Sequence, residues 1–200
     1  MTAGARRRPV LGIFVGGRAR RMGGFPKGLL PVSASGETIV ERMVRLAHAC
    51  DLEAALVGDA ASYAGVAPHV VVLADSPAGI GPLGGLAALL AHARREPALA
   101  VACDMPFVTE ALVTRLRDAP MSAPIVAARR TPDGPFEPFL ARYDTARVEP
   151  VLAERIGAGV RSFQQLFAAC GAAEWPLAPE EQAAWNDWDT PEDLPDWARR

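Results

Sequence analysis

The chain has 200 residues, and half of them are hydrophobic, which is enough for one domain with a substantial buried core. Its formal net charge of −2 gives no general attraction for nucleic acid, because nucleic-acid binders usually show a strongly basic face. No apolar run reaches the length of a membrane span, and the run over 10–15 is too short for a signal-peptide core, so we expect a cytoplasmic protein without membrane contact.

Strands and helices are predicted to alternate along the chain. The first element is a buried strand over 10–15 that ends in two glycines. Strands follow at 54–57, 70–73, 99–102 and 125–128, with helices at 39–50, 82–93 and 109–116. Beyond residue 130 the pattern weakens to a strand at 139–143, helices at 148–156 and 162–169, and a helix start at Thr190. This order predicts an α/β fold with helices on both faces of a parallel sheet.

A glycine-rich loop follows the first strand and reads GGRARRMGGFPK over 16–27. Glycines allow backbone N–H groups to close around phosphate oxygens, and arginines add bidentate donors. Lys27 is the one lysine among 21 basic residues, and it adds a compact charge that arginine would replace poorly. The P-loop pattern does not fit, because Gly28 stands where the hydroxyl residue belongs, and the G-x-G-x-x-G fingerprint is absent.

The loop resembles the signature of the molybdenum cofactor guanylyltransferases, the MobA-like nucleotidyltransferase family. Three further segments resemble blocks of that family in the same order: LADSPAGIGPLGGL at 73–86, VACDMPFVTEALVTRL at 101–116 and DWDTPEDL at 187–194. The resemblance covers nearly the whole chain. It implies a three-layer, Rossmann-like nucleotidyltransferase fold with a mostly parallel sheet. It also implies one domain over 1–200, with a nucleotide-binding half at about 9–130 and an acceptor-side half at about 131–200.

The resemblance implies transfer of GMP from GTP to the terminal phosphate of molybdopterin or the molybdenum cofactor, with release of pyrophosphate and with Mg²⁺ as cofactor. The residues it assigns to catalysis are Lys27, Arg21 and Asp104. Those assigned to the nucleotide are Phe14, Val15, Gly16, Gly17, Arg18, Arg21, Met22, Gly23, Lys27, Asp75, Gly81, Pro82, Gly84 and Asp104. Asp104 and Asp189 are expected at the metal, and Glu137, Pro138 and Asp187 on the acceptor side.

Several alternatives stay open. The Gly16-Gly17 pair favours guanine, whereas Asp187 and Asp189 stand where asparagines are common and allow a cytidylyltransferase acting on the same cofactor. These two aspartates either add a metal ligand or cap the helix at Pro191. A sugar- or isoprenoid-phosphate nucleotidyltransferase and a non-catalytic nucleotide-binding protein are the other candidates. Transient contact with other molybdenum cofactor enzymes is also left open.

Overall fold

A seven-stranded sheet forms the centre of the computed structural model, which describes residues 7–16, 25–33, 35–188 and 190–195. The strand order is β3-β2-β1-β4-β6-β5-β7. The strands are β1 (Val10–Phe14), β2 (Glu53–Val57), β3 (Val71–Leu73), β4 (Ala98–Ala102), β5 (Ile125–Arg129), β6 (Phe136–Tyr143) and β7 (Ala173–Glu174). Only β6 runs antiparallel to its neighbours β4 and β5, so the prediction of a mostly parallel sheet is confirmed.

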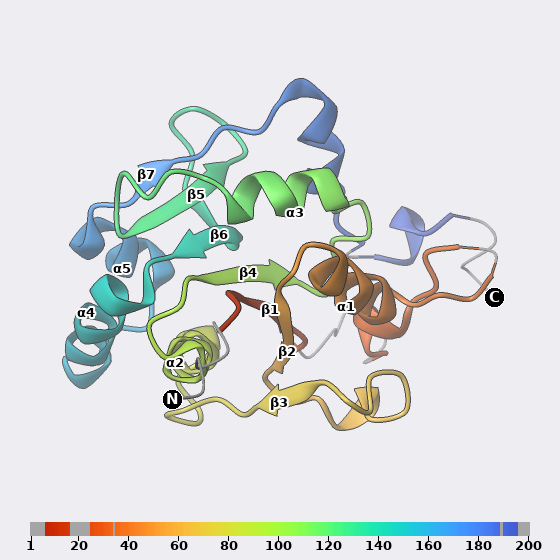
Figure 1. Ribbon diagram of the computed structural model, residues 1–200, viewed down its shortest axis with the longest axis horizontal. Helices are drawn as coiled ribbons and strands as arrows, with labels where there is room; N and C mark the ends of the chain where they lie inside the picture. The colour runs from red at the N-terminus through yellow and green to blue at the C-terminus, as the bar shows by residue number, and fades with distance from the viewer. Residues whose placement is uncertain (1–6, 17–24, 34, 189, 196–200) are drawn as a thin grey trace, which may run out of the picture.

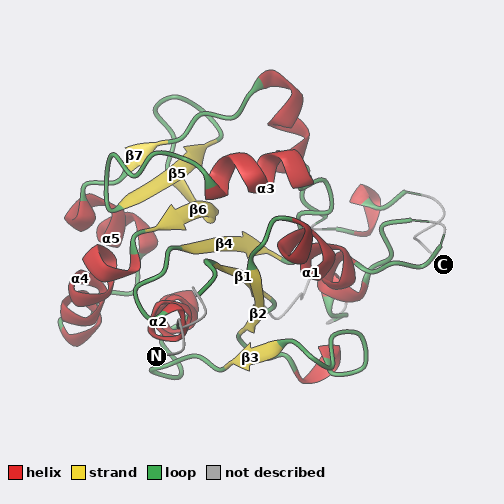
Figure 2. Cartoon of the chain, in the orientation of Figure 1, coloured by secondary structure: helices red, strands yellow, loops and turns green. Residues whose placement is uncertain are grey.

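Helices cover both faces of the sheet, as predicted (Figure 1). The α-helices are α1 (Ile39–Ala49), α2 (Pro82–Ala93), α3 (Glu110–Arg117), α4 (Thr145–Gly157) and α5 (Phe163–Cys170). Short 3₁₀ turns lie at η2 (Lys27–Leu29), η3 (Ala61–Tyr63), η4 (Pro179–Trp185) and η5 (Pro191–Asp193). Helices α1 and α3 pack on one face, and α2, α4 and α5 pack on the other, which gives three layers (Figure 2). None of the helices in the described ranges has the length and apolarity needed to cross a lipid bilayer.

The central strand β1 is buried along its whole length and contributes to both cores. Leu11 and Ile13 belong to the core under α1 and α3, whereas Val10 and Phe14 belong to the core under α2, α4 and α5. Successive side chains of a strand point to opposite faces, so a strand covered on both faces is apolar at every position. Because β1 is held in the core from Val10 to Phe14, the position at which the glycine-rich loop leaves the sheet is also held.

Local capping explains where two helices begin. The Thr38 hydroxyl accepts the N–H of Glu41 at 3.2 Å, and the Glu41 carboxylate accepts the N–H of Thr38 at 2.8 Å, which forms a capping box in front of α1. The Thr109 hydroxyl accepts the N–H of Leu112 at 3.2 Å and caps α3.

The predicted helix start at Thr190 is only partly correct, because η5 ends after three residues. Asp193 closes this turn by accepting the N–H and hydroxyl of Thr190 at 2.7 and 3.0 Å. Pro195 lies two residues further on. A proline disfavours helical geometry at the preceding residue and has no N–H to donate, so a helix cannot continue here.

Candidate active site

A cavity of about 380 Å³ opens at the carboxyl ends of β1 and β4, and we call it the Lys27 cavity. The two strands end side by side, with Phe14 opposite Ala102. The chain leaves β1 through Val15 and Gly16 and leaves β4 through Cys103 and Asp104, so both loops line the cavity. This is the edge at which parallel α/β sheets bind ligands. The two loops therefore meet at one rim of the sheet, as the sequence predicts.

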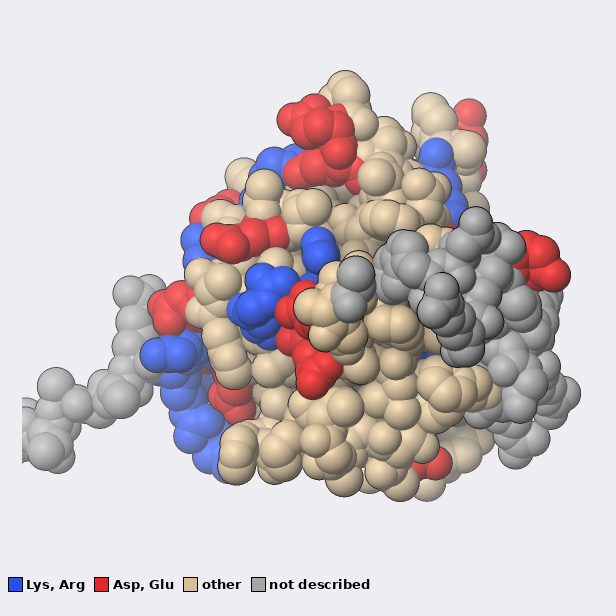
Figure 3. Space-filling model, turned by 90° about the vertical axis from the view of Figure 1, so that its right-hand side faces the viewer, with Lys and Arg blue, Asp and Glu red and all other residues tan. Residues whose placement is uncertain are grey.

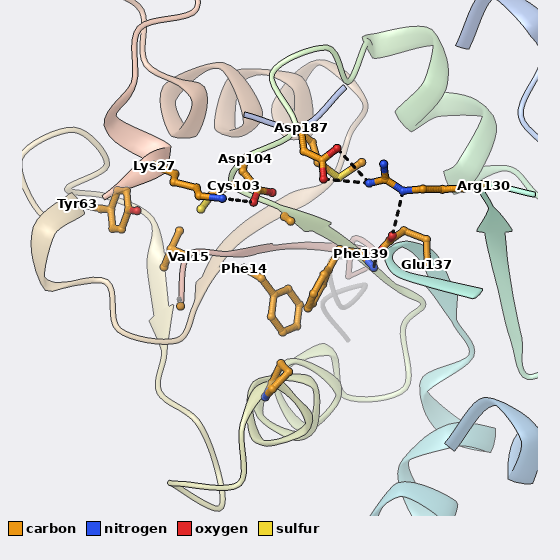
Figure 4. A pocket seen from close by; sticks show the side chains of 14 residues that line it. Phe14, Val15, Lys27, Tyr63, Cys103, Asp104, Arg130, Glu137, Phe139 and Asp187 are labelled. Atoms are coloured by element: carbon orange, nitrogen blue, oxygen red, sulfur yellow. Dashed lines mark hydrogen bonds and ion pairs between the residues drawn. The ribbon is translucent and has the colours of Figure 1, made fainter. Parts of the chain in front are cut away.

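Lys27 and Asp104 both line this cavity, and their charged groups point toward each other (Figure 4). The Lys27 Nζ lies 3.1 Å from the Asp104 Oδ2, and the two side chains are only 16% and 25% exposed. Lys27 begins the turn η2, which packs tightly because Gly28 follows it. A Cβ at Gly28 would lie 2.6 Å from Val40 Cγ2 and 2.8 Å from Tyr63 Cε1. Glycine thus lets the turn approach the core and directs the ammonium group into the cavity.

Tyr63 and Cys103 form an uncharged floor beneath this ion pair. Both residues are buried. Burial raises the pKa of the Cys103 thiol to about 12, and burial also raises the pKa of the Tyr63 hydroxyl. Neither group ionises near neutral pH, so neither supplies a thiolate or a phenolate nucleophile there. The charges in this part of the cavity are therefore those of Lys27 and Asp104.

A second cavity of about 700 Å³ adjoins the first, and we call it the Asp75 cavity. The two share six lining residues: Phe14, Val15, Gly16, Tyr63, Pro82 and Phe139. Burial raises the pKa of Asp75, and its carboxylate has no hydrogen-bond partner within the described part of the chain. Gly81 and Pro82 start α2 at this wall. Pro82 lines both cavities, so the positive end of the α2 dipole lies where they adjoin and favours an anionic group at that point.

Gly84 is absent from the lining of both cavities, although the resemblance assigns it to the nucleotide. A Cβ at this position would lie 2.4 Å from the Pro77 carbonyl oxygen and 3.2 Å from the Asp75 Cβ. The glycine lets the loop that carries Asp75 lie directly against α2. Its contribution is to position Asp75 by close packing.

Two of the residues predicted for the acceptor side, Glu137 and Asp187, lie beside an arginine that the sequence interpretation missed. Arg130 follows β5, and its Nη2 donates to both carboxylate oxygens of Asp187 at 3.1 and 3.0 Å. Its Nε lies 3.9 Å from the Glu137 Oε2. Burial raises the pKa of Glu137, and the backbone N–H of Phe139 opposes this shift. A basic residue at the carboxyl end of a strand was the signal available in the sequence.

The C-terminal segment reaches the cavity through a backbone hydrogen bond, in which the N–H of Trp188 donates to the Asp104 carbonyl at 2.9 Å. This bond brings Asp187 into the Lys27 cavity. Asp187 does not cap the terminal turn, because the N–H of Thr190 donates to Asp193. Pro138 is not part of the lining, and its carbonyl accepts the buried Tyr143 hydroxyl at 2.8 Å.

The described residues contain no group of three or more His, Cys, Asp or Glu side chains arranged to hold a metal ion. The face seen in Figure 3 carries acidic and basic side chains intermixed, without a continuous basic surface. Six predicted site residues lie outside the described ranges: Gly17, Arg18, Arg21, Met22, Gly23 and Asp189.

Comparisons of the sequence agree on one family. The sequence model of the MobA-like NTP transferase domain matches residues 12–172. A molybdenum cofactor guanylyltransferase from Pseudomonas fluorescens is 32% identical over 161 residues, which cover 80% of this chain and 78% of the relative. Another from Serratia proteamaculans is 31% identical over 186 residues, covering 92% and 91%.

Solved structures share the fold. Molybdopterin-guanine dinucleotide biosynthesis protein A from Archaeoglobus fulgidus superposes with a TM-score of 0.74 at 20% identity, covering 94% of this chain and 96% of that one. The 2-C-methyl-D-erythritol 4-phosphate cytidylyltransferase from Thermus thermophilus gives 0.68 at 19% identity, covering 96% and 97%. The family match spans most of the chain, and the fold is that of the nucleotidyltransferases. The chain therefore belongs to the MobA-like NTP transferase family.

Proposed function

We propose that the protein transfers GMP from GTP to the terminal phosphate of molybdopterin or the molybdenum cofactor and releases pyrophosphate. Relatives that match most of the chain are named molybdenum cofactor guanylyltransferases. The observation that carries the proposal is the pairing of Lys27 with Asp104 at the carboxyl ends of β1 and β4. A lysine and a carboxylate at this edge suit a substrate with several phosphates and a bound cation.

In the proposed reaction, a phosphate oxygen of the acceptor attacks the α-phosphorus of GTP in line. A new P–O bond forms as the bond to the bridging α–β oxygen breaks, and pyrophosphate leaves with the electron pair. The acceptor oxygen is already anionic, so no strong general base is required. Positioning and charge neutralisation then carry the catalysis, and Lys27 is placed to offset the triphosphate charge.

Mg²⁺ fits the carboxylates on this wall. The ion usually takes one or two protein carboxylates and completes its shell with phosphate oxygens and water, so a larger protein cluster is not required. We assign Asp104 to the ion, because it leaves a buried strand and is partly shielded from solvent. Asp189 is the second candidate, by resemblance alone. Bound Mg²⁺ would supply positive charge to the phosphates.

The remaining assignments follow the two cavities. We place the base and ribose in the Asp75 cavity, against Phe14, Val15, Gly16, Asp75, Gly81 and Pro82. We place the triphosphate against the loop that contains Gly17, Arg18, Arg21, Met22 and Gly23. The acceptor lies toward Glu137 and Asp187, with Pro138 next to them.

A pyrophosphate-release assay tests the proposal. The protein is supplied with Mg²⁺, molybdopterin or molybdenum cofactor, and each nucleoside triphosphate in turn. We expect release with GTP and an acceptor, and we expect Lys27→Ala to abolish most of it. If CTP is the one triphosphate that supports rapid pyrophosphate release with the acceptor, the proposed guanylyl transfer is replaced by cytidylyl transfer. Nucleotide binding without pyrophosphate release for any triphosphate would reject the catalytic proposal.

A further inference from the structure

We propose that Arg130 is a charge-compensating positioning residue that neutralises Asp187 and Glu137, so that the acceptor wall of the Lys27 cavity can face an anionic phosphate. The inference rests on the proposed function, since it concerns how the same site tolerates its acceptor. It assigns a role to a residue that neither the motifs nor the comparisons single out.

All three nitrogens of the Arg130 guanidinium have partners, and Figure 4 shows the interactions with Asp187 and Glu137. Its Nη2 donates to both oxygens of Asp187 at 3.1 and 3.0 Å, and its Nε lies 3.9 Å from Glu137. Its Nη1 donates to the Trp185 carbonyl at 3.1 Å, and its carbon lies 5.2 Å from the centre of the Trp185 ring. Because each nitrogen of the planar guanidinium has a partner, its charge stays between the Asp187 and Glu137 carboxylates.

The charge balance of the cavity shows why this matters. Among the described lining residues, two cations, Lys27 and Arg130, stand against three carboxylates, Asp104, Glu137 and Asp187, which gives a net charge of −1 when all are ionised. Loss of Arg130 would leave −2 in a cavity whose proposed ligands are all phosphates. A carboxylate and a phosphate a few ångströms apart repel each other strongly where solvent is partly excluded. Arg130 therefore offsets the negative charge that Asp187 brings to the acceptor wall.

Anchoring of the C-terminal segment does not depend on Arg130 alone. Arg115 on α3 donates through Nε to Glu181 at 2.8 Å and through Nη2 to the Pro176 carbonyl at 2.9 Å. The Trp188 N–H also holds the segment to Asp104. Arg115 and Glu181 lie outside the cavity lining. The chain thus provides a matched ion pair that anchors the same segment without facing the ligand.

The test compares Arg130→Met, Arg130→Lys, Arg130→Met in an Asp187→Asn background, and Arg115→Met. Steady-state pyrophosphate release gives KM for the acceptor and kcat, and calorimetry gives the affinity for GTP with Mg²⁺. We expect Arg130→Met to raise the acceptor KM roughly tenfold at low salt, as one unit charge a few ångströms away would do, and to weaken GTP binding less. The defect should shrink as ionic strength rises.

The control variants decide between charge compensation and other roles. Arg130→Lys keeps the charge and should stay within about threefold of wild type. Arg130→Met combined with Asp187→Asn restores the wild-type net charge of −1 among the described lining residues, so the acceptor KM of this double variant should stay within about threefold of wild type. Arg115→Met should lower the melting temperature and leave KM unchanged.

Two results would overturn the inference. Equal losses for Arg130→Lys and Arg130→Met would mean that fork geometry, rather than charge, is required. An acceptor KM for the Arg130→Met, Asp187→Asn double variant as high as that of Arg130→Met alone would mean that Arg130 contacts the ligand directly. A wild-type protein that binds GTP without transferring GMP would instead reject the proposed function. The GTP affinities of the Arg130 variants would then test the inference without any transfer reaction. Weaker GTP binding in Arg130→Met that Arg130→Lys restores would support the inference. Equal GTP binding in Arg130→Met and wild type would refute it.

Discussion

Replacing Gly84 with alanine should weaken nucleotide binding, although Gly84 lines neither cavity. The new Cβ would lie 2.4 Å from the Pro77 carbonyl oxygen, and ordinary van der Waals contact begins at 3.4 Å, so the carbonyl must retreat by about 1 Å. The obstacle is backbone, which cannot rotate away as a side chain would. Overpacking of this kind typically costs about 1–3 kcal/mol. Because Pro77 lies two residues after Asp75, the shift is transmitted to the carboxylate.

Two measurements check this reasoning. A cost of about 1–3 kcal/mol should lower the melting temperature by roughly 2–12 °C in a chain of this size. Calorimetric titration with GTP should show a Kd raised about tenfold, with wild-type GTP affinity as the reference. Gly157→Ala is the matched control, because a Cβ there meets nothing within 4 Å and alanine favours the end of α4. Gly84→Ala with unchanged melting temperature and unchanged Kd would refute the packing argument.

Three further variants probe the site and the fold. Lys27→Ala should lower kcat by about 10²–10³ while the protein stays folded, because a preorganised charge is lost; wild-type turnover would remove Lys27 from catalysis. Thr38→Ala should cost about 0.5–2 kcal/mol in denaturant unfolding and leave KM unaltered, since the cap at Glu41 lies outside both cavities; altered kinetics would contradict this. For Glu137→Gln, burial raises the pKa of Glu137 in the fold, so ionisation costs stability as pH rises from the unfolded pKa through the folded pKa. The variant should therefore gain melting temperature over wild type at pH 8 and lose that gain near pH 4, and a gain independent of pH would count against the assignment.

The first half of the fold was predictable because its signals are local. The run over 10–15 is apolar at every position, and only a strand covered on both faces has this pattern at that length. The caps at Thr38 and Thr109 join residues only three positions apart, and both are hydrogen bonds in the structure. Patterns that involve residues only a few positions apart can be recognised without knowledge of the tertiary structure.

The direction of β6 required a longer-range argument. Six residues, 130–135, separate β5 from β6. A parallel neighbour would need a crossover of a dozen or more residues, so this short connection forces an antiparallel pair. The length of the loop therefore indicates the direction of β6, whereas the apolar periodicity of the strand does not. The same turn places Arg130 beside Glu137, and this proximity brings a cation to the acceptor wall.

The pairing of Arg130 with Asp187 could not be predicted, because 57 positions separate the two residues and the hydrogen bond from Trp188 to Asp104 brings them together. Asp187 read from the sequence alone suggests a metal ligand or a cap, since an isolated carboxylate near phosphates needs some positive partner. The fold supplies that partner from β5. The two cations of the cavity are thus suited to different tasks. The compact ammonium of Lys27 is proposed to face the triphosphate, and the planar guanidinium of Arg130 lies between the carboxylates of Asp187 and Glu137. In a chain whose other Lys and Arg residues are all arginines, a lysine at position 27 agrees with this division.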